Sequence, residues 1–257
     1  MIRVEHLCKS FDGVEVLHNI NAGFDNGRIN LIIGQSGSGK TVLMKNIVGL
    51  LEPDAGKVEY DGRDFTHLVL KEKKKQRREM GMIFQNAALF DSLTVLDNVM
   101  FPLNMFSVKT EAEKKNRARW CLKRVDLDGT EEKFPNELSG GMQKRVAIAR
   151  AIVLEPRYLF CDEPNSGLDP KTSLVIDELI SSITHEDSIT TIVNTHDMNS
   201  VMGIGENILF ICEGRAEWNG TNKEILTACN KRLEDFILAS DILRAAKEQL
   251  TINNKKL

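Results

Sequence analysis

The chain has 257 residues, 42% of them hydrophobic, which is enough for one α/β domain, with or without an appendage, and for a sizeable core. Its formal net charge of -3 gives no support to bulk electrostatic binding of nucleic acid, and its five scattered cysteines, without a C-x-x-C pair, favour small core side chains in a reducing compartment. The N-terminus lacks the features of a signal peptide, and no apolar run approaches the roughly 20 residues that span a bilayer, so we expect a cytoplasmic protein.

Strands and helices are predicted to alternate along most of the chain. Apolar runs typical of strands, with a turn at Asp12–Gly13 between the first two, lie at residues 1–11, 15–24, 30–33, 56–62, 80–85, 158–164 and 190–197. Helical patterns lie at residues 41–51, over most of 90–152, and at 172–184. This alternation predicts a parallel sheet covered by helices on both faces.

Two further segments are strongly charged or amphipathic. Residues 71–79, KEKKKQRRE, favour a solvated helix face over a patch for lipid or nucleic acid. From about Ala228 the pattern changes to a tail of polar helix formers, and apolar residues recur near helical spacing over 223–250: Ile225, Leu233, Phe236, Ile237 and Leu243. This stripe can be buried on the chain's own core or on a second copy, and lipid is least favoured because the polar face carries acidic residues.

A phosphate-binding loop is predicted between the third strand and the first helix. Residues 34–41 match the pattern G-x-x-x-x-G-K-[ST]. Glycines let backbone N–H groups approach phosphate oxygens, and the helix that follows presents its positive end to the same anion. Lys40 adds a positive charge, and the Thr41 hydroxyl can bind Mg²⁺. We expect a nucleotide site formed by Gly34, Gln35, Ser36, Gly37, Ser38, Gly39, Lys40 and Thr41.

An acidic pair ends the buried strand YLFCDEP. Asp162 is placed to hold Mg²⁺ through a water molecule, and Glu163 follows directly, placed to deprotonate an attacking water as general base. The alternative is an ordinary strand end with acidic turn residues. The upstream phosphate-binding loop favours the functional interpretation.

Residues 136–152, NELSGGMQKRVAIARAI, predict a second helix whose N-terminus can bind an anion, through Ser139, Gly140 and Gly141. Taken alone, this is a helix cap. With the two motifs above, however, the chain resembles the ATP-binding-cassette (ABC) ATPase family, whose signature sequence is similar to LSGGMQKR. The resemblance implies a P-loop NTPase (RecA-like) fold with a parallel-sheet core, an antiparallel β edge and an inserted helical subdomain. The implied nucleotide-binding domain is 1–226 (core 1–89 and 151–226, helical subdomain 90–150). The pattern of polar helix formers described above then predicts a C-terminal helical extension, 227–257.

The resemblance assigns roles to further residues. Phe11 lies where the family stacks an aromatic ring on adenine, although an edge-strand core aromatic is the alternative. Gln85 matches the family glutamine that contacts Mg²⁺ and the attacking water, and a glutamine that caps a loop is its alternative. His196 matches the histidine that bonds the γ-phosphate, at the end of a strand, where ligands of parallel sheets bind. The remaining histidines show no metal-ligand spacing.

The resemblance also explains why one chain holds two anion-binding helix ends. In the family, two copies pack head to tail, and the signature helix of each caps the ATP held by the other. The residues expected to act in this way are Ser139, Gly140, Gly141, Gln143 and, from the SGLDP segment, Asp169. The alternative for Asp169 is a helix-entry turn with Pro170 at the first helical position.

Residues 86–103, NAALFDSLTVLDNVMFPL, lie where transporter members of the family contact their membrane subunit. Four apolar residues here can be simple core or a groove for a partner helix: Leu89, Phe90, Val95 and Phe101. This segment, together with Met142, resembles the ATPase of the Mla (maintenance of lipid asymmetry) phospholipid-transport group. Importers of small polar solutes share several of these letters.

Two classes of function follow from the resemblance: a transport ATPase, and a soluble cassette ATPase for DNA repair, iron–sulphur assembly or translation. The chain shows neither the second cassette of translation members nor the long coiled coils of repair members, so transport is favoured. We therefore expect ATP and Mg²⁺ as cofactors, and a position on the cytoplasmic face of the inner membrane. The expected partners are a second copy, integral membrane permease subunits and an MCE-type lipid-binding subunit, with no nucleic acid.

Overall fold

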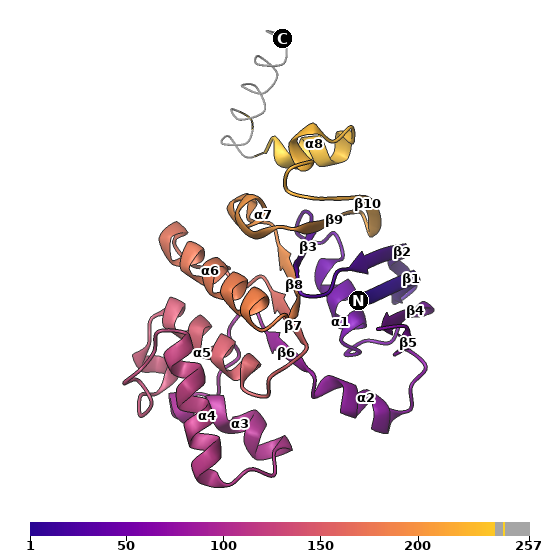
Figure 1. Cartoon of the computed structure of the whole chain (residues 1–257). Coiled ribbons are helices and arrows are strands. Elements are labelled where there is room, and N and C mark those ends of the chain that lie inside the picture. The colour runs from indigo at the N-terminus through magenta and orange to yellow at the C-terminus, as the bar shows by residue number, and fades with distance from the viewer. Residues whose placement is uncertain (240–243, 245–257) are drawn as a thin grey trace. The chain divides into compact units, whose positions relative to one another are not determined.

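The computed structural model describes residues 1–239 and Arg244 (Figure 1). These residues form two compact units, which we describe one at a time. The β unit consists of Ile2–Phe24, Asn30–Thr66 and the described residues from Thr195 onward. The helical unit consists of Met1, Asp25–Ile29 and His67–Asn194. The division into subdomains that the sequence suggests stays a prediction.

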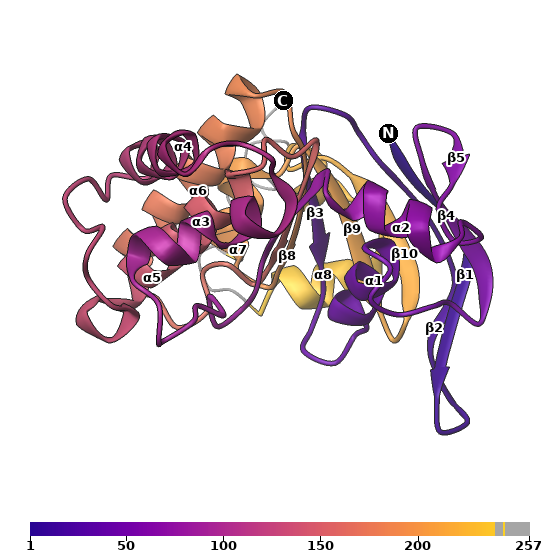
Figure 2. The same cartoon turned by 90° about the horizontal axis from the view of Figure 1, so that it is seen from below.

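The β unit holds an antiparallel sheet and a second group of strands. The antiparallel sheet has the order β2-β1-β4-β5 and is formed by β1 (Ile2–Phe11), β2 (Val14–Phe24), β4 (Ala55–Tyr60) and β5 (Arg63–Asp64). The β1–β2 hairpin lies at the right of Figure 2. The second group consists of β3 (Ile29–Ile33), β9 (Asn207–Cys212) and β10 (Arg215–Gly220), with β9 in the middle. β9 pairs in parallel with β3 and antiparallel with β10. The helices of this unit are α1 (Lys40–Ile47), α7 (Met198–Ile204) and α8 (Lys231–Ile237), with a 3₁₀ turn at Ile225–Thr227.

The helical unit holds three parallel strands and five α-helices. The strands are β6 (Met80–Ile83), β7 (Tyr158–Asp162) and β8 (Thr190–Thr195), with β7 in the middle. All residues of β7 and β8 are buried, which explains why neither sequence alternates between apolar and polar residues. The helices are α2 (Leu70–Arg77), α3 (Val95–Phe106), α4 (Glu111–Arg124), α5 (Gly140–Ile152) and α6 (Pro170–Glu186), with a 3₁₀ turn at Pro135–Glu137. The helices α3, α4 and α5 pack against one another.

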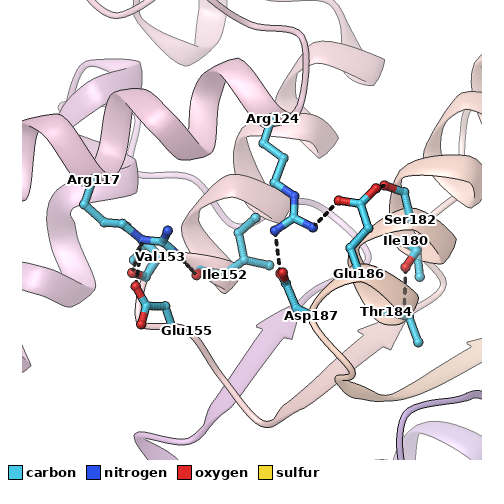
Figure 3. A network of polar contacts seen from close by, with 10 residues as sticks. All are labelled: Arg117, Arg124, Ile152, Val153, Glu155, Ile180, Ser182, Thr184, Glu186 and Asp187. Atoms are coloured by element: carbon cyan, nitrogen blue, oxygen red, sulfur yellow. Dashed lines mark hydrogen bonds and ion pairs between the residues drawn. The ribbon is translucent and has the colours of Figure 1, made fainter.

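Two arginines of α4 connect the helices of this unit (Figure 3). Arg117 donates from Nε to the Val153 carbonyl at 3.1 Å and from Nη2 to the Ile152 carbonyl at 3.0 Å, so a cation satisfies carbonyls at the C-terminus of α5. Arg124 pairs with Glu186 at 2.9 Å and also with Asp187, at the end of α6. The positions of α5 and α6 are thus fixed to α4 by directed contacts as well as by packing.

The structure confirms the strands and helices expected from the sequence and adds three strands, β5, β9 and β10, and the helix α7. Every residue of α2 is exposed or half-exposed, which agrees with a solvated charged helix. The C-terminal stripe divides: Ile225, Leu233 and Ile237 are buried in the β unit, while Leu243 lies outside the described residues. The first part of the tail therefore docks on the chain's own core. Within the described part of the chain, no helix is both long and apolar enough to cross a bilayer.

Candidate nucleotide site

The phosphate-binding loop joins β3 to α1 in the β unit. Its backbone requires glycine: Gly34 and Gly39 have φ values of 151° and 105°, in the left-handed region. A Cβ atom at Gly34 would lie 2.2 Å from the Ile211 carbonyl oxygen and 2.7 Å from Ser38 Oγ. The loop packs so closely against β9 that a side chain at this position cannot be accommodated.

The polar groups of the loop fit an anion. Lys40 is buried, and its Nζ donates to the carbonyls of Gly34 at 2.9 Å and Gln35 at 3.0 Å, so a positive charge is held inside the loop. Ser38 Oγ is buried and has no hydrogen-bond partner in the described part of the chain. An unpaired buried hydroxyl costs about 1–3 kcal/mol, which an added acceptor such as a phosphate oxygen relieves. By contrast, Gln35, Ser36 and Gly37 are exposed at the tip of the loop.

The β unit also contains Phe11 and His196. Phe11 is 40% exposed at the end of β1, with Lys9 Nζ 5.5 Å from its ring centroid, so it is not a core aromatic. His196 is exposed directly after β8. Their contacts with adenine and with the γ-phosphate stay predictions.

The helical unit brings together two expected catalytic residues, Gln85 and Glu163, and Asp162, which is expected to hold Mg²⁺. Asp162 is the buried last residue of β7, and Glu163 follows it with a left-handed φ of 47°. Gln85 Nε2 lies 3.3 Å from Glu163 Oε2 and 3.1 Å from Ser166 Oγ. A donor at Glu163 Oε2 holds this carboxylate in place, which suits a group that must orient a water molecule.

The signature segment forms a capped helix N-terminus in the helical unit. Ser139 is the N-cap of α5, and its Oγ accepts from the Met142 N–H at 3.3 Å; Ser139 and Gly140 are exposed, whereas Gly141 is buried. Gln143 donates from Nε2 to the Pro135 carbonyl at 2.9 Å, so it holds the turn that precedes the helix. Their action on the ATP of a second copy stays a prediction.

Asp169 is the N-cap of α6, with Pro170 at the start of the helix. Its carboxylate accepts from the Lys171 and Thr172 N–H groups at 3.0 and 3.1 Å. Hydrogen bonds from the Thr172 hydroxyl and N–H lower the pKa of Asp169. The helix-entry alternative is therefore present in the structure, and the expected place of Asp169 at a subunit interface stays a prediction.

Two cations of α5 that sequence reasoning missed hold the loop that follows Gln85. Lys144, which is buried, donates from Nζ to the Gln85 carbonyl, and Arg150 donates to the carbonyls of Ala87 and Ala88, each at 2.7 Å. Burial lowers the pKa of both cations. Their role has no local sequence signal, because the acceptors are backbone carbonyls about 60 residues upstream.

Comparison with known proteins agrees with this geometry. A model of the ABC transporter family matches residues 17–166. The "Probable ribonucleotide transport ATP-binding protein mkl" of Mycobacterium leprae is 35% identical, over 92% of this chain and 68% of its own length. The chloroplast protein "trigalactosyldiacylglycerol 3" of Arabidopsis thaliana is 36% identical, over 93% of this chain and 74% of its own. The chain spans about two thirds of the length of the mycobacterial relatives.

A solved structure also matches. The ATP-binding cassette MJ0796, described as a dimer in a post-hydrolysis state bound to ADP and Pi, is 34% identical and superimposes with a TM-score of 0.78, over 86% of this chain and 99% of that one. This similarity confirms the P-loop NTPase fold and the ATPase activity expected from the sequence. The chain therefore belongs to the ABC transporter family, and it is the ATP-binding and ATP-hydrolysing cassette of such a transporter.

Proposed function

We propose that this cassette drives phospholipid transport at a bacterial inner membrane, as the ATPase of an Mla-like transporter. The observation that carries the proposal is a surface of apolar side chains on the helical unit, beside the loop that holds Gln85. We call it the α3 stripe and define it as Phe90, Phe101, Met105 and Val108.

The α3 stripe is exposed although it is apolar. Phe101 and Met105 are four residues apart on α3, with exposed fractions of 38% and 61%, and Val108 is exposed just after the helix ends. The Phe90 and Phe101 rings lie 4.6 Å apart, so these two side chains are in contact. Val95 is fully buried, so this part of the segment is core. A group of exposed apolar side chains beside a functional loop is typical of a partner-binding surface, and an amphipathic helix of a permease suits it.

We propose the following division of work at the ATP. The phosphate-binding loop, with Lys40 and Ser38, would hold the phosphates. Thr41, Gln85 and, through water, Asp162 would hold Mg²⁺, which would supply positive charge to neutralise the phosphates. Glu163 takes the proton of the attacking water, and Gln85 orients Glu163 and that water molecule. The contact between Gln85 and Glu163 within the helical unit supports their joint role.

A second copy completes each site in this proposal. Ser139 and Gly140 are exposed at the N-terminus of α5, where backbone N–H groups and the helix dipole favour an anion. The dimeric MJ0796 cassette supports the pairing of two copies. Closure over two ATP molecules and reopening after hydrolysis would then move the permease subunits.

Lipid is the proposed cargo for two reasons. The segment 86–103 resembles the Mla group, and the name of the Arabidopsis relative contains that of a glycerolipid. A ribonucleotide or another small polar solute is the second candidate, because the name of the Mycobacterium leprae relative contains ribonucleotide transport. Among lipid carriers, an MCE-type subunit is the further partner that we propose.

Purification from native membranes tests the proposal. We expect the tagged cassette to bring down a multi-spanning subunit, and Met105→Glu to lose it while ATP binding is retained. Leu174→Glu, an exposed apolar residue on α6, is the matched control and should keep the subunit. The co-purified complex is then placed in phospholipid vesicles. ATP-dependent transfer of a labelled phospholipid supports the lipid proposal, whereas transfer of a ribonucleotide alone would replace it with the second candidate.

A further inference from the structure

Asn194 lies beside the acidic pair, at the end of the neighbouring strand. The strands β7 and β8 run in parallel, and their register places Asp162 opposite Asn194. Asn194 is fully buried, and its Nδ2 donates to Asp162 Oδ1 at 2.9 Å. The contact lies within the helical unit, where both strands belong to one sheet.

The main chain of Asn194 contacts the second acidic residue. Glu163 has a left-handed φ of 47°, which side chains of L-residues rarely adopt, and its N–H donates to the Asn194 carbonyl at 3.0 Å. This bond helps to hold the turn of the chain directly after Asp162. One residue therefore contacts the side chain of Asp162 and the backbone of Glu163.

We infer that Asn194 is a positioning residue for the acidic pair, an inference that rests on the roles proposed above for Asp162 and Glu163. The torsion that rotates a carboxylate about its last bond is broad, so a carboxylate without a fixed donor samples many orientations. A lysine or arginine at position 194 would fix the orientation but would also balance the charge. The neutral amide of Asn194 fixes Asp162 and leaves its negative charge available to the hydrated Mg²⁺.

Removing the Asn194 amide should raise the Mg²⁺ concentration that the protein needs for ATP hydrolysis. Groups that hydrogen-bond to a residue holding a metal typically change metal affinity or activity by about 10–100-fold when they are removed. Asn194→Leu removes the amide at similar volume and keeps the backbone bond to Glu163. We expect the Mg²⁺ concentration for half-maximal ATP hydrolysis to rise at least about tenfold. ATP affinity without Mg²⁺, measured with a fluorescent ATP analogue, should stay within about twofold, because the phosphate-binding loop is intact.

The control separates positioning from loss of a buried hydrogen bond. Thr191 lies three residues before Asn194 on β8, and its buried Oγ1 is hydrogen-bonded to Thr184 Oγ1 at 2.6 Å. Thr191→Val deletes this hydroxyl. It should lower stability without changing the Mg²⁺ requirement. Melting curves check each variant for folding, and Asn194→Val replaces Asn194→Leu if the larger side chain prevents folding.

Asp162→Asn separates a failure of the positioning role of Asn194 from a failure of the proposed role of Asp162. If Asp162→Asn raises the Mg²⁺ requirement and folded Asn194→Leu does not, Asn194 is not a positioning residue and the proposed role of Asp162 stands. If neither variant changes the Mg²⁺ requirement, the role of Asp162 is wrong and the inference is overturned with it. A rise in both variants, absent in Thr191→Val, supports the inference.

Discussion

Replacing Leu233 by alanine tests where the C-terminal helix is anchored. Helix α8 has seven residues, too few to be stable alone, so its order depends on docking. Leu233 is fully buried, its N–H donates to the Asn230 side chain at 2.9 Å, and the rings of Phe236 and Phe210 lie 5.4 Å apart. Removing a buried leucine side chain costs about 2–5 kcal/mol. For a chain of this size, that corresponds to a fall in melting temperature on the order of 10 °C.

Calorimetry and hydrogen exchange measure the outcome. If the tail opens before the rest of the β unit, the loss appears first as faster exchange of the α8 amides. Asp235→Ala, on the exposed face of the same helix, is the control and should change stability by less than about 0.5 kcal/mol. Deletion from Lys231 onward should also lower the melting temperature of the monomer. Unchanged melting and unchanged exchange in Leu233→Ala would refute own-core docking and point to burial on a second copy.

Three further outcomes are expected. Glu163→Gln should bind ATP, hydrolyse almost none, and therefore elute as an ATP-trapped dimer on a sizing column; turnover near wild type would remove Glu163 from the role of base. Ser139→Arg should leave ATP binding by the monomer unchanged and abolish hydrolysis, and a monomeric preparation with full activity would contradict the two-copy site. Burial raises the pKa of the Cys121 thiol to about 11 and also raises that of Cys161, so a thiol reagent near neutral pH should label exposed Cys229 first and these two only after unfolding.

Much of the fold follows from local patterns. The strands β3, β7 and β8 are buried and each contains a short apolar run, and α1 ends close to Gly49, as the sequence indicates. The strand β9 has a similar run, NILFIC, which sequence reasoning could have used. By contrast, β10 has no fully buried residue and no apolar period, so only its pairing with β9 makes it a strand.

Helical periodicity also fails to separate core from surface on α3. Val95 and Phe101 lie on the same apolar-rich segment, yet one is fully buried and the other is exposed. The hydrophobic effect favours removal of both side chains from water, and a single chain shows only which of them its own core covers. The sequence therefore predicts the helix but not which residues remain for a partner.

The loop after Gln85 shows a third limit of sequence reasoning. Ala87 and Ala88 have φ values of 57° and 49°, a conformation that costs an alanine about 1–2 kcal/mol each and that no local pattern predicts. Three hydrogen bonds from Lys144 and Arg150 to the carbonyls of this loop oppose that strain, and bonds to charged groups contribute about 1.5–3 kcal/mol each. The bonds therefore outweigh the strain before the desolvation of the two cations is counted. Because both cations belong to α5, the signature helix and the Gln85 loop form one hydrogen-bonded assembly, and a partner that displaces the loop must either break these bonds or move α5 with it.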